Sequence, residues 1–185
     1  MGSRQHSWVA YTAYFGTFFF LIGMACCEAP RRKYPLNYIF LFSFTFLESY
    51  LIGVIAATYE KEVVLMAVVC TAAVCIALTL FAFQTKIDFT LHGGVLFAGL
   101  IILIMLGFLR MFIGGPFLYY LYAGLGALIF SGYLVYDTQL LIGGKHHKYQ
   151  LSPDEYIFGA LNLYLDIINL FLIILSLLGG GRRRD

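Results

Sequence analysis

The sequence predicts an all-α protein, a polytopic transmembrane helix bundle with six spans in a single domain over residues 1–185. Hydrophobic residues make up 61% of the chain and charged residues only 12%, whereas soluble domains carry roughly 25% charged residues. The mean hydropathy is +0.85. Six apolar segments can be drawn, and at roughly 20 residues per bilayer crossing they leave room only for tails and short loops. These observations exclude a soluble catalytic domain, a nucleic-acid module and a secreted disulfide scaffold, and they predict membrane lipid as a partner.

Each predicted span ends at polar, glycine or proline residues. The spans are residues 9–27, 36–59, 63–83, 93–109, 117–142 and 156–178. Gly114-Gly115-Pro116 is a turn signal after the fourth span, and Gly143-Gly144 and Gly179–Gly181 are stop signals after the fifth and sixth. The segment Ser152–Glu155 (SPDE) before the last span matches a capping box, with Ser152 as the N-cap and Glu155 closing the box.

The basic residues give a preference for the orientation in the membrane. All 12 lie outside the predicted spans, and if the loops alternate between sides, six fall on each side. When Arg182 to Arg184 are set aside, the side of the Arg31 loop carries six bases and the other side three. The positive-inside rule then favours a cytoplasmic Arg31 loop.

Three acidic residues lie inside the predicted spans, with no base in any span: Glu48, Asp137 and Asp166. A carboxylate at the centre of a spanning helix costs about 2.5–3.5 kcal/mol. Each is therefore expected to be protonated, hydrogen-bonded, bound to a cation or placed in a water-filled cavity. Asn162, Asp166 and Asn169 recur at i, i+4 and i+7, so they form one polar face that should point into the bundle. Glu48 also lies on a small polar helix face and is expected to face inward.

Asp137 and Asp166 are expected to lie at similar depths on neighbouring antiparallel helices. At 1.5 Å per residue their depths differ by about 7–8 Å, which a modest tilt can close. Two carboxyl groups in hydrogen-bonding reach cannot both ionise cheaply, so a shared proton would make them a pH-sensitive latch. Hydrogen bonding of each aspartate to tyrosine or backbone alone remains an alternative.

Carboxylate and amide oxygens are the ligands that a hard divalent cation prefers, and the predicted spans contain no basic residue that would compete with it. We therefore expect a calcium pathway in which Asp137 and Asp166 bind Ca²⁺ transiently, with Glu48, Asn162 and Asn169 as the supporting polar face. The sequence contains no phosphate loop, dinucleotide fingerprint or GxSxG nucleophile motif. We expect no catalytic residue, no enzymatic activity, no nucleic-acid partner and no cofactor, with Ca²⁺ as the permeant ion.

Several motifs are shared with a known family. The most specific are Tyr136–Leu141 (YDTQLL), Gly143–His146 (GGKH) and Ser152–Phe171 (SPDEYIFGALNLYLDIINLF), and further matches are Cys26-Cys27 before Pro30-Arg31-Arg32, Phe83–Lys86 (FQTK), Asp88–Thr90 (DFT) and Gly94–Phe97 (GVLF). With these motifs the chain closely resembles, over essentially its whole length, the transmembrane Bax-inhibitor-motif family, lifeguard branch.

This resemblance implies a function and a set of residues. In that family two aspartates on the last two long helices form a hydrogen-bonded, pH-sensing pair in a calcium leak pathway, and by motif they fall on Asp137 and Asp166. A basic residue after the family's second span is implicated in holding the closed state and maps onto Arg31 or Arg32, in a loop that the resemblance places in the cytoplasm. Family members have seven spans, so the six predicted here match the last six, and the first family helix is expected to be absent.

The resemblance also implies a cellular setting. Family members dampen cell-death signalling, largely by regulating calcium in internal stores. The expected location is therefore the membrane of the endoplasmic reticulum or Golgi, with the plasma membrane as an alternative. The expected partners are calcium, lipid and membrane proteins that regulate cell death.

Two other function classes remain open. An intramembrane aspartyl protease also uses two carboxyl groups that share a proton and activate water, and Tyr136-Asp137 is similar to one half of such a site. The second half of those enzymes is Gly-x-Gly-Asp, however, and Tyr164-Leu165-Asp166 stands here instead. A non-conducting membrane adaptor that restrains cell-death signalling by binding partners would use the same lipid-facing aromatic surface.

Overall fold

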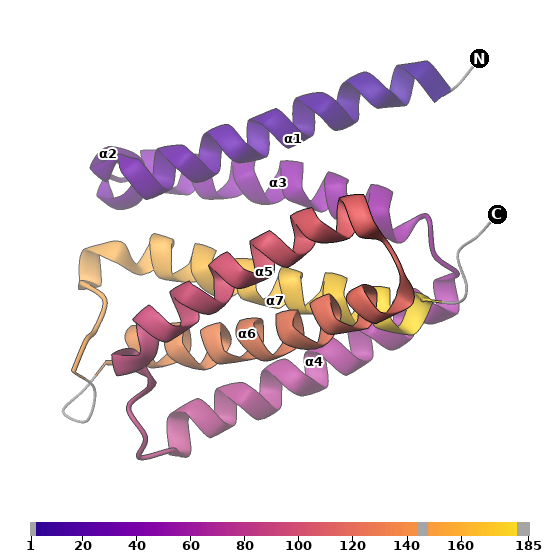
Figure 1. The fold of residues 1–185 in the computed structure, drawn as a ribbon. Coiled ribbons are helices and arrows are strands. Elements are labelled where there is room, and N and C mark those ends of the chain that lie inside the picture. Colours follow the sequence, from indigo (N-terminus) through magenta and orange to yellow (C-terminus); the bar gives the residue numbers. More distant parts are fainter. Residues whose placement is uncertain (1–2, 144–147, 181–185) are drawn as a thin grey trace.

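The computed structural model of the chain describes residues 3–143 and 148–180, and for residues 3–7 and Ala10 it describes the backbone alone. The described part is a bundle of α-helices (Figure 1). The helices are α1 (Ser3–Cys26), α2 (Glu28–Arg32), α3 (Leu36–Ala56), α4 (Lys61–Gln84), α5 (Gly93–Ile113), α6 (Pro116–Ile142) and α7 (Tyr156–Gly179), with 3-10 turns η1 (Phe89–His92) and η2 (Pro153–Glu155). Lys145 and Arg182 to Arg184, which entered the charge comparison, lie outside the described residues, as does part of the GGKH motif.

The predicted helical membrane architecture is confirmed. Five segments of the described chain are long and apolar enough to cross a membrane: Leu36–Ala56, Lys61–Gln84, Phe89–Ile113, Pro116–Ile142 and Pro153–Gly179. These segments contain the last five predicted spans, except that residues 57–59 of the predicted span 36–59 lie beyond the end of α3 at Ala56. The first predicted span, 9–27, falls on α1, whose apolar stretch Tyr11–Cys26 is shorter. A sixth crossing therefore stays a prediction.

Glycines end α5 and α6 as the sequence predicts. Gly114 and Gly115 have φ angles of 63° and 94°, and Gly143 has a φ angle of 59°. This left-handed region is readily adopted only by residues without a Cβ atom. Pro116 then begins α6, where its fixed φ angle suits the first helical turn.

Two basic residues that lie outside the predicted spans fall within the ends of long helices, Lys61 at the start of α4 and Arg110 near the end of α5. Helix α5 continues past the predicted end at residue 109 to Ile113, so Arg110 lies in its last turn. The Arg110 guanidinium lies 4.6 Å from the centroid of the Tyr119 ring and 5.7 Å from that of Tyr122, both on α6. These cation–π contacts join the two helices of the hairpin and reduce the cost of placing a charge there.

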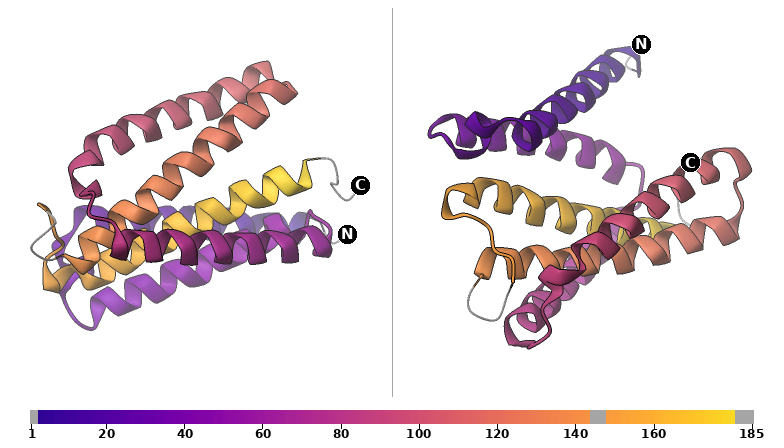
Figure 2. Two further views of the ribbon diagram at one scale, coloured as in Figure 1. Left: turned by 90° about the horizontal axis from the view of Figure 1, so that it is seen from below. Right: turned by 60° about the vertical axis from the view of Figure 1, so that its left-hand side comes forward.

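Helix α7 lies at the centre of the bundle. It packs against α6 and α4 on one side and against α3 and α2 on the other, while α5 packs on α6. Figure 2 shows α7 between the hairpin of α1 and α3 and the layer that contains α4 and α6. Two apolar clusters lie along it: one contains Phe171 and Leu175 with Val63 of α4, and the other contains Leu161 with Phe44 of α3. The position of α7 is therefore set by apolar contacts with helices on both of its sides.

The predicted capping box before α7 is not formed. Ser152 does precede the turn η2, but its side chain makes no capping hydrogen bond. The Glu155 backbone N–H donates to the Ser152 carbonyl at 2.8 Å. The Glu155 carboxylate instead pairs with two arginines of α2, because an ion pair with a fixed partner competes with the weaker local cap. The predicted start of the last helix is right and its predicted cap is wrong.

Candidate functional site

Asp137 of α6 and Asp166 of α7 come together in the interior of the bundle. The two helices pack closely along their lengths, and both side chains are buried, with 7% and 5% of their surface exposed. Their carboxyl groups lie within hydrogen-bonding distance of each other, so one proton can be shared between them. Such sharing is the arrangement expected for two acids that cannot both ionise cheaply.

Close approach of α6 and α7 depends on a glycine. Gly126 of α6 is buried, and a Cβ atom built there would lie 2.7 Å from Cδ1 of Ile173 on α7. A second close contact is at Gly159 of α7, where a Cβ atom would lie 3.0 Å from Cγ of Leu141. The two glycines therefore bring the backbones near enough for short acidic side chains to meet between them.

The acidic pair lines a cavity of about 720 Å³ between α5, α6 and α7. Asn162 and Asn169 of α7 line the same cavity, so the predicted polar face of this helix does point into the bundle. The Asn169 amide donates to the Leu165 carbonyl at 2.8 Å, which turns its nitrogen toward its own helix. Most of the remaining wall is leucine, isoleucine, phenylalanine and tyrosine. The site thus places a few polar groups in an apolar chamber, as ligand and ion sites commonly do.

The structure does not bring Glu48 to this pair. Glu48 lies on α3, is half-buried, and within the described chain is not among the residues that line the cavity. It lies on the same helix as Phe44, whose ring packs against Tyr164 on the α3-facing side of α7. The residues that gather at the cavity are therefore Asp137, Asp166, Asn162 and Asn169.

One oxygen of the pair has unused bonding capacity. Oδ2 of Asp166 is buried and has no hydrogen-bond partner among the residues that the structure describes. A buried acceptor of this kind is costly to leave unpaired. It is therefore the atom of the site best suited to carry a proton.

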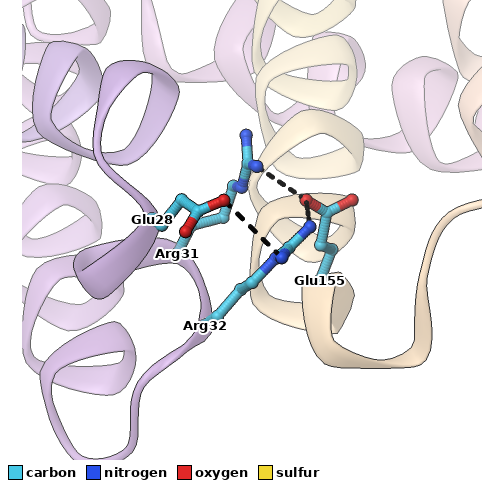
Figure 3. A network of polar contacts seen from close by, with 4 residues as sticks. All are labelled: Glu28, Arg31, Arg32 and Glu155. Atoms are coloured by element: carbon cyan, nitrogen blue, oxygen red, sulfur yellow. Dashed lines mark hydrogen bonds and ion pairs between the residues drawn. The ribbon is translucent and has the colours of Figure 1, made fainter.

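The two predicted gating bases form an ion-pair cluster with Glu155 (Figure 3). Arg31 Nη2 and Arg32 Nη2 lie 2.8 Å and 3.0 Å from the same Oε1 oxygen of Glu155. The hydrogen bond to Glu155 raises the pKa of the Arg32 guanidinium above its ordinary value, so the cation persists. Arg32 Nη1 also lies 3.7 Å from Oε1 of the exposed Glu28. Glu155 is a site residue that the sequence assigned only to a helix cap.

Arg31 also reaches toward the cavity wall. Its guanidinium lies 5.5 Å from the centroid of the Phe158 ring, and Phe158 lines the cavity. The cluster therefore fixes the short helix α2 against the start of α7, at the same end of the bundle as the ring. This contact connects the predicted gating bases to the chamber of Asp137 and Asp166.

A further buried polar residue of α6 was not predicted from the sequence as a structural or functional residue. Gln139 of α6 is fully buried; its Nε2 donates to the Ile87 carbonyl at 3.0 Å, and its Oε1 accepts the Phe89 backbone N–H at 2.7 Å. It thereby holds the segment between α4 and α5 against α6. The signal for it was present, because Gln139 is an uncharged polar residue in a predicted span and follows Asp137 by two positions.

Comparisons with known proteins agree with this fold and these motifs. A family model described as "Inhibitor of apoptosis-promoting Bax1" matches residues 1–184. Protein lifeguard 3 of Homo sapiens is 40% identical over 180 residues, which cover 93% of this chain and 55% of that protein. Protein lifeguard 4 of Mus musculus is 43% identical over 148 residues, which cover 80% of this chain and 60% of that protein. The chain thus spans somewhat more than half the length of these curated relatives.

Proposed function

We infer a function for this chain from its family: the chain belongs to the family described as inhibitor of apoptosis-promoting Bax1. We propose that it restrains cell death as a pH-sensitive calcium leak channel. The membranes proposed for this activity are those of internal calcium stores, the endoplasmic reticulum or Golgi. The proposed partners are Ca²⁺, lipid and membrane proteins that regulate cell death.

The observation that carries this proposal is the buried pair of Asp137 and Asp166 in a chamber between helices. Intramembrane carboxyl groups that face a bundle interior commonly mark ion or proton pathways. Ca²⁺ prefers oxygen ligands, and Asn162 and Asn169, whose side chains carry amide oxygens, line the same wall. Among the described residues that line the chamber, none is basic, so no fixed cation competes with the permeant ion.

The proposed closed state is the form in which the two aspartates share one proton. The shared proton holds α6 and α7 together at this depth, and its loss leaves two like charges in a poorly solvated site. At about 4 Å and an effective dielectric constant near 20, their repulsion is about 4 kcal/mol. That energy is sufficient to separate the helices or to recruit a divalent cation between them.

Reconstitution of the full chain into liposomes that contain a calcium-sensitive dye tests this proposal. We expect Asp137→Ala and Asp166→Ala each to reduce Ca²⁺ flux, because each removes an oxygen ligand from the path. Glu48→Gln is the matched control, since it neutralises a half-buried carboxyl group outside the chamber and should leave flux near that of the unchanged chain. Unchanged flux in both alanine variants would overturn the assignment to this pair.

The other function classes give different results in the same preparation. A non-conducting adaptor would show no flux in the unchanged chain and would still capture its membrane partners after both aspartates are replaced. An intramembrane protease would cleave a helical reporter, and that cleavage would require both aspartates.

A further inference from the structure

The chamber is larger and more apolar than a calcium site requires. Ca²⁺ is held by oxygen atoms at 2.3–2.6 Å, which needs only a small polar space. The volume of about 720 Å³ lies instead in the range of about 300–1,000 Å³ typical of sites for organic molecules. Most of its wall is apolar, with Leu103, Phe130 and Phe158 among the lining residues.

The polar groups of the chamber are concentrated on α6 and α7. Asp137 and Asp166 supply the acidic part of the wall, and the described lining residues include neither lysine nor arginine. Asp166 is 95% buried, and its Oδ2 atom has no hydrogen-bond partner in the described chain. An apolar chamber with an acidic pair and no basic residue among its described lining residues is complementary to a molecule with a long apolar body and a cationic donor at one end.

We propose that this chamber binds a lipophilic amine in its protonated form, with the ammonium group facing the Asp137–Asp166 pair and its hydrocarbon body lying along Leu103, Phe130 and Phe158. Two carboxyl groups that share one proton carry a single negative charge, which one monovalent cation balances. This assignment deepens the proposed function and rests on it in one respect: a bound amine would occupy the ion path and reduce flux.

The route of entry favours a ligand that is dissolved in the membrane. Ile104 of α5 lines the chamber and is 50% exposed, and the next residue, Met105, is 63% exposed, so this part of the chamber wall is close to the surface of the helix bundle. In a membrane that surface faces hydrocarbon, so the chamber can be reached laterally from the bilayer. An amine with a hydrocarbon chain concentrates there, whereas a small hydrophilic amine stays in water.

Photolabelling in proteoliposomes tests the site without any ion gradient. The probes are a twelve-carbon primary amine, the corresponding alcohol and the corresponding trimethylammonium compound, each with a diazirine in mid-chain, in phosphatidylcholine vesicles. We expect the amine to label the cavity-lining parts of α5, α6 or α7 about tenfold more than either control, the ratio expected for one hydrogen bond to a charged group. Peptide mass spectrometry locates the label.

Two variants identify the acceptor. Asp137→Asn combined with Asp166→Asn should bring amine labelling of these segments down to the level of the alcohol, because either aspartate alone would keep the single negative charge of the pair. Glu48→Gln should leave amine labelling unchanged. If the double variant fails to assemble, Ile104→Trp serves in its place, because a larger side chain at the mouth should reduce amine labelling in a chain whose acidic pair is intact.

Several results would overturn the amine site. These are equal labelling by the amine and the alcohol, equal labelling by the amine and the trimethylammonium probe, or label confined to helix surfaces away from the chamber. Labelling as expected in a chain that conducts no Ca²⁺ would support the amine site and contradict the proposed channel. Normal flux without selective labelling would contradict the amine site alone.

Discussion

Arg31 Nη2 lies 2.8 Å from Glu155 Oε1, and this ion pair joins the short helix after α1 to the start of α7. The two side chains are partly exposed, at 23% and 15%, so the bond is weakened but not eliminated by solvent. It is shared with Arg32, whose guanidinium approaches the same oxygen. Loss of the Glu155 charge therefore removes both contacts at once.

We predict that Glu155→Gln raises the resting Ca²⁺ leak several-fold. The amide retains the size of the side chain but loses a charge whose pairing is worth about 1 kcal/mol at a partly exposed site. Dye-loaded liposomes measure the leak. Glu28→Gln is the control, because Glu28 is 78% exposed and lies 3.7 Å from Arg32. Equal leaks in the two variants would show that the cluster does not hold the closed state.

We predict that Ca²⁺ flux falls as pH falls through the titration of the aspartate pair. Below that range the pair gains a proton, loses its negative charge and attracts Ca²⁺ less; above it, the shared proton is lost and repulsion favours the open form. Asp166→Asn should flatten this pH profile while the chain still folds, because the amide keeps the hydrogen-bonding shape without titrating.

Flux measured across a pH series in both variants checks this prediction. Glu48→Gln should keep the pH profile of the unchanged chain, since Glu48 lies outside the chamber lining. If instead Asp166→Asn kept the profile and Glu48→Gln lost it, the pH sensor would be Glu48.

We predict that Gln139→Leu lowers the free energy of unfolding by about 1–3 kcal/mol, because it removes two hydrogen bonds that the buried Gln139 side chain makes to partly buried backbone groups of Ile87 and Phe89. Thermal unfolding of the purified protein in detergent measures the loss. Gln84→Leu is the matched control, since Gln84 is exposed at the end of α4. A similar melting temperature for both variants would contradict a clamping role for Gln139.

We predict that two adjacent glycines at the start of α5 respond differently to alanine. A Cβ atom at Gly93 would lie 2.9 Å from the Tyr136 hydroxyl oxygen and 3.2 Å from its ring, whereas a Cβ atom at Gly94 would meet nothing within 4 Å. Gly93→Ala should therefore cost about 1 kcal/mol of stability and shift Tyr136, which lines the chamber. Gly94→Ala should be neutral or slightly stabilising.

Melting temperature and Ca²⁺ flux of both glycine variants test this difference. Gly93→Ala should change both quantities. A chain in which Gly94→Ala is the more damaging substitution would show that packing against Tyr136 is not what this turn requires.

The helices and the polar face of α7 could be predicted because their signals are local. Apolar runs set the helices, Gly114 and Gly143 set two of their ends, and the spacing of Asn162, Asp166 and Asn169 placed all three on one face. Each signal depends on residues within one helix or its flanking turn, where backbone geometry alone decides which side chains share a surface.

The partners of Glu155 and Gln139 could not be predicted in the same way. The hydrogen bond from Arg32 to Glu155 joins residues 123 positions apart, and the bond from Phe89 to Gln139 joins residues 50 apart. Sequence periodicity contains no information on such pairs. For Glu155 a local alternative, the capping box with Ser152, had a strong sequence signature, and the tertiary ion pair replaced it.

The central position of α7 has a mechanical consequence. Phe158, Asn162, Asp166 and Asn169 recur at intervals of four, four and three residues, so they lie on one stripe of the helix. Glu155, the residue that directly precedes α7, is held by the arginines at one end, and Asp166 meets Asp137 about 15 Å beyond the start of the helix. If α7 rotates about its own axis as a rigid body and thereby releases Glu155, Asp166 must turn with it. The ion pairs at the charged end of the helix and the aspartate pair at its centre are therefore mechanically coupled.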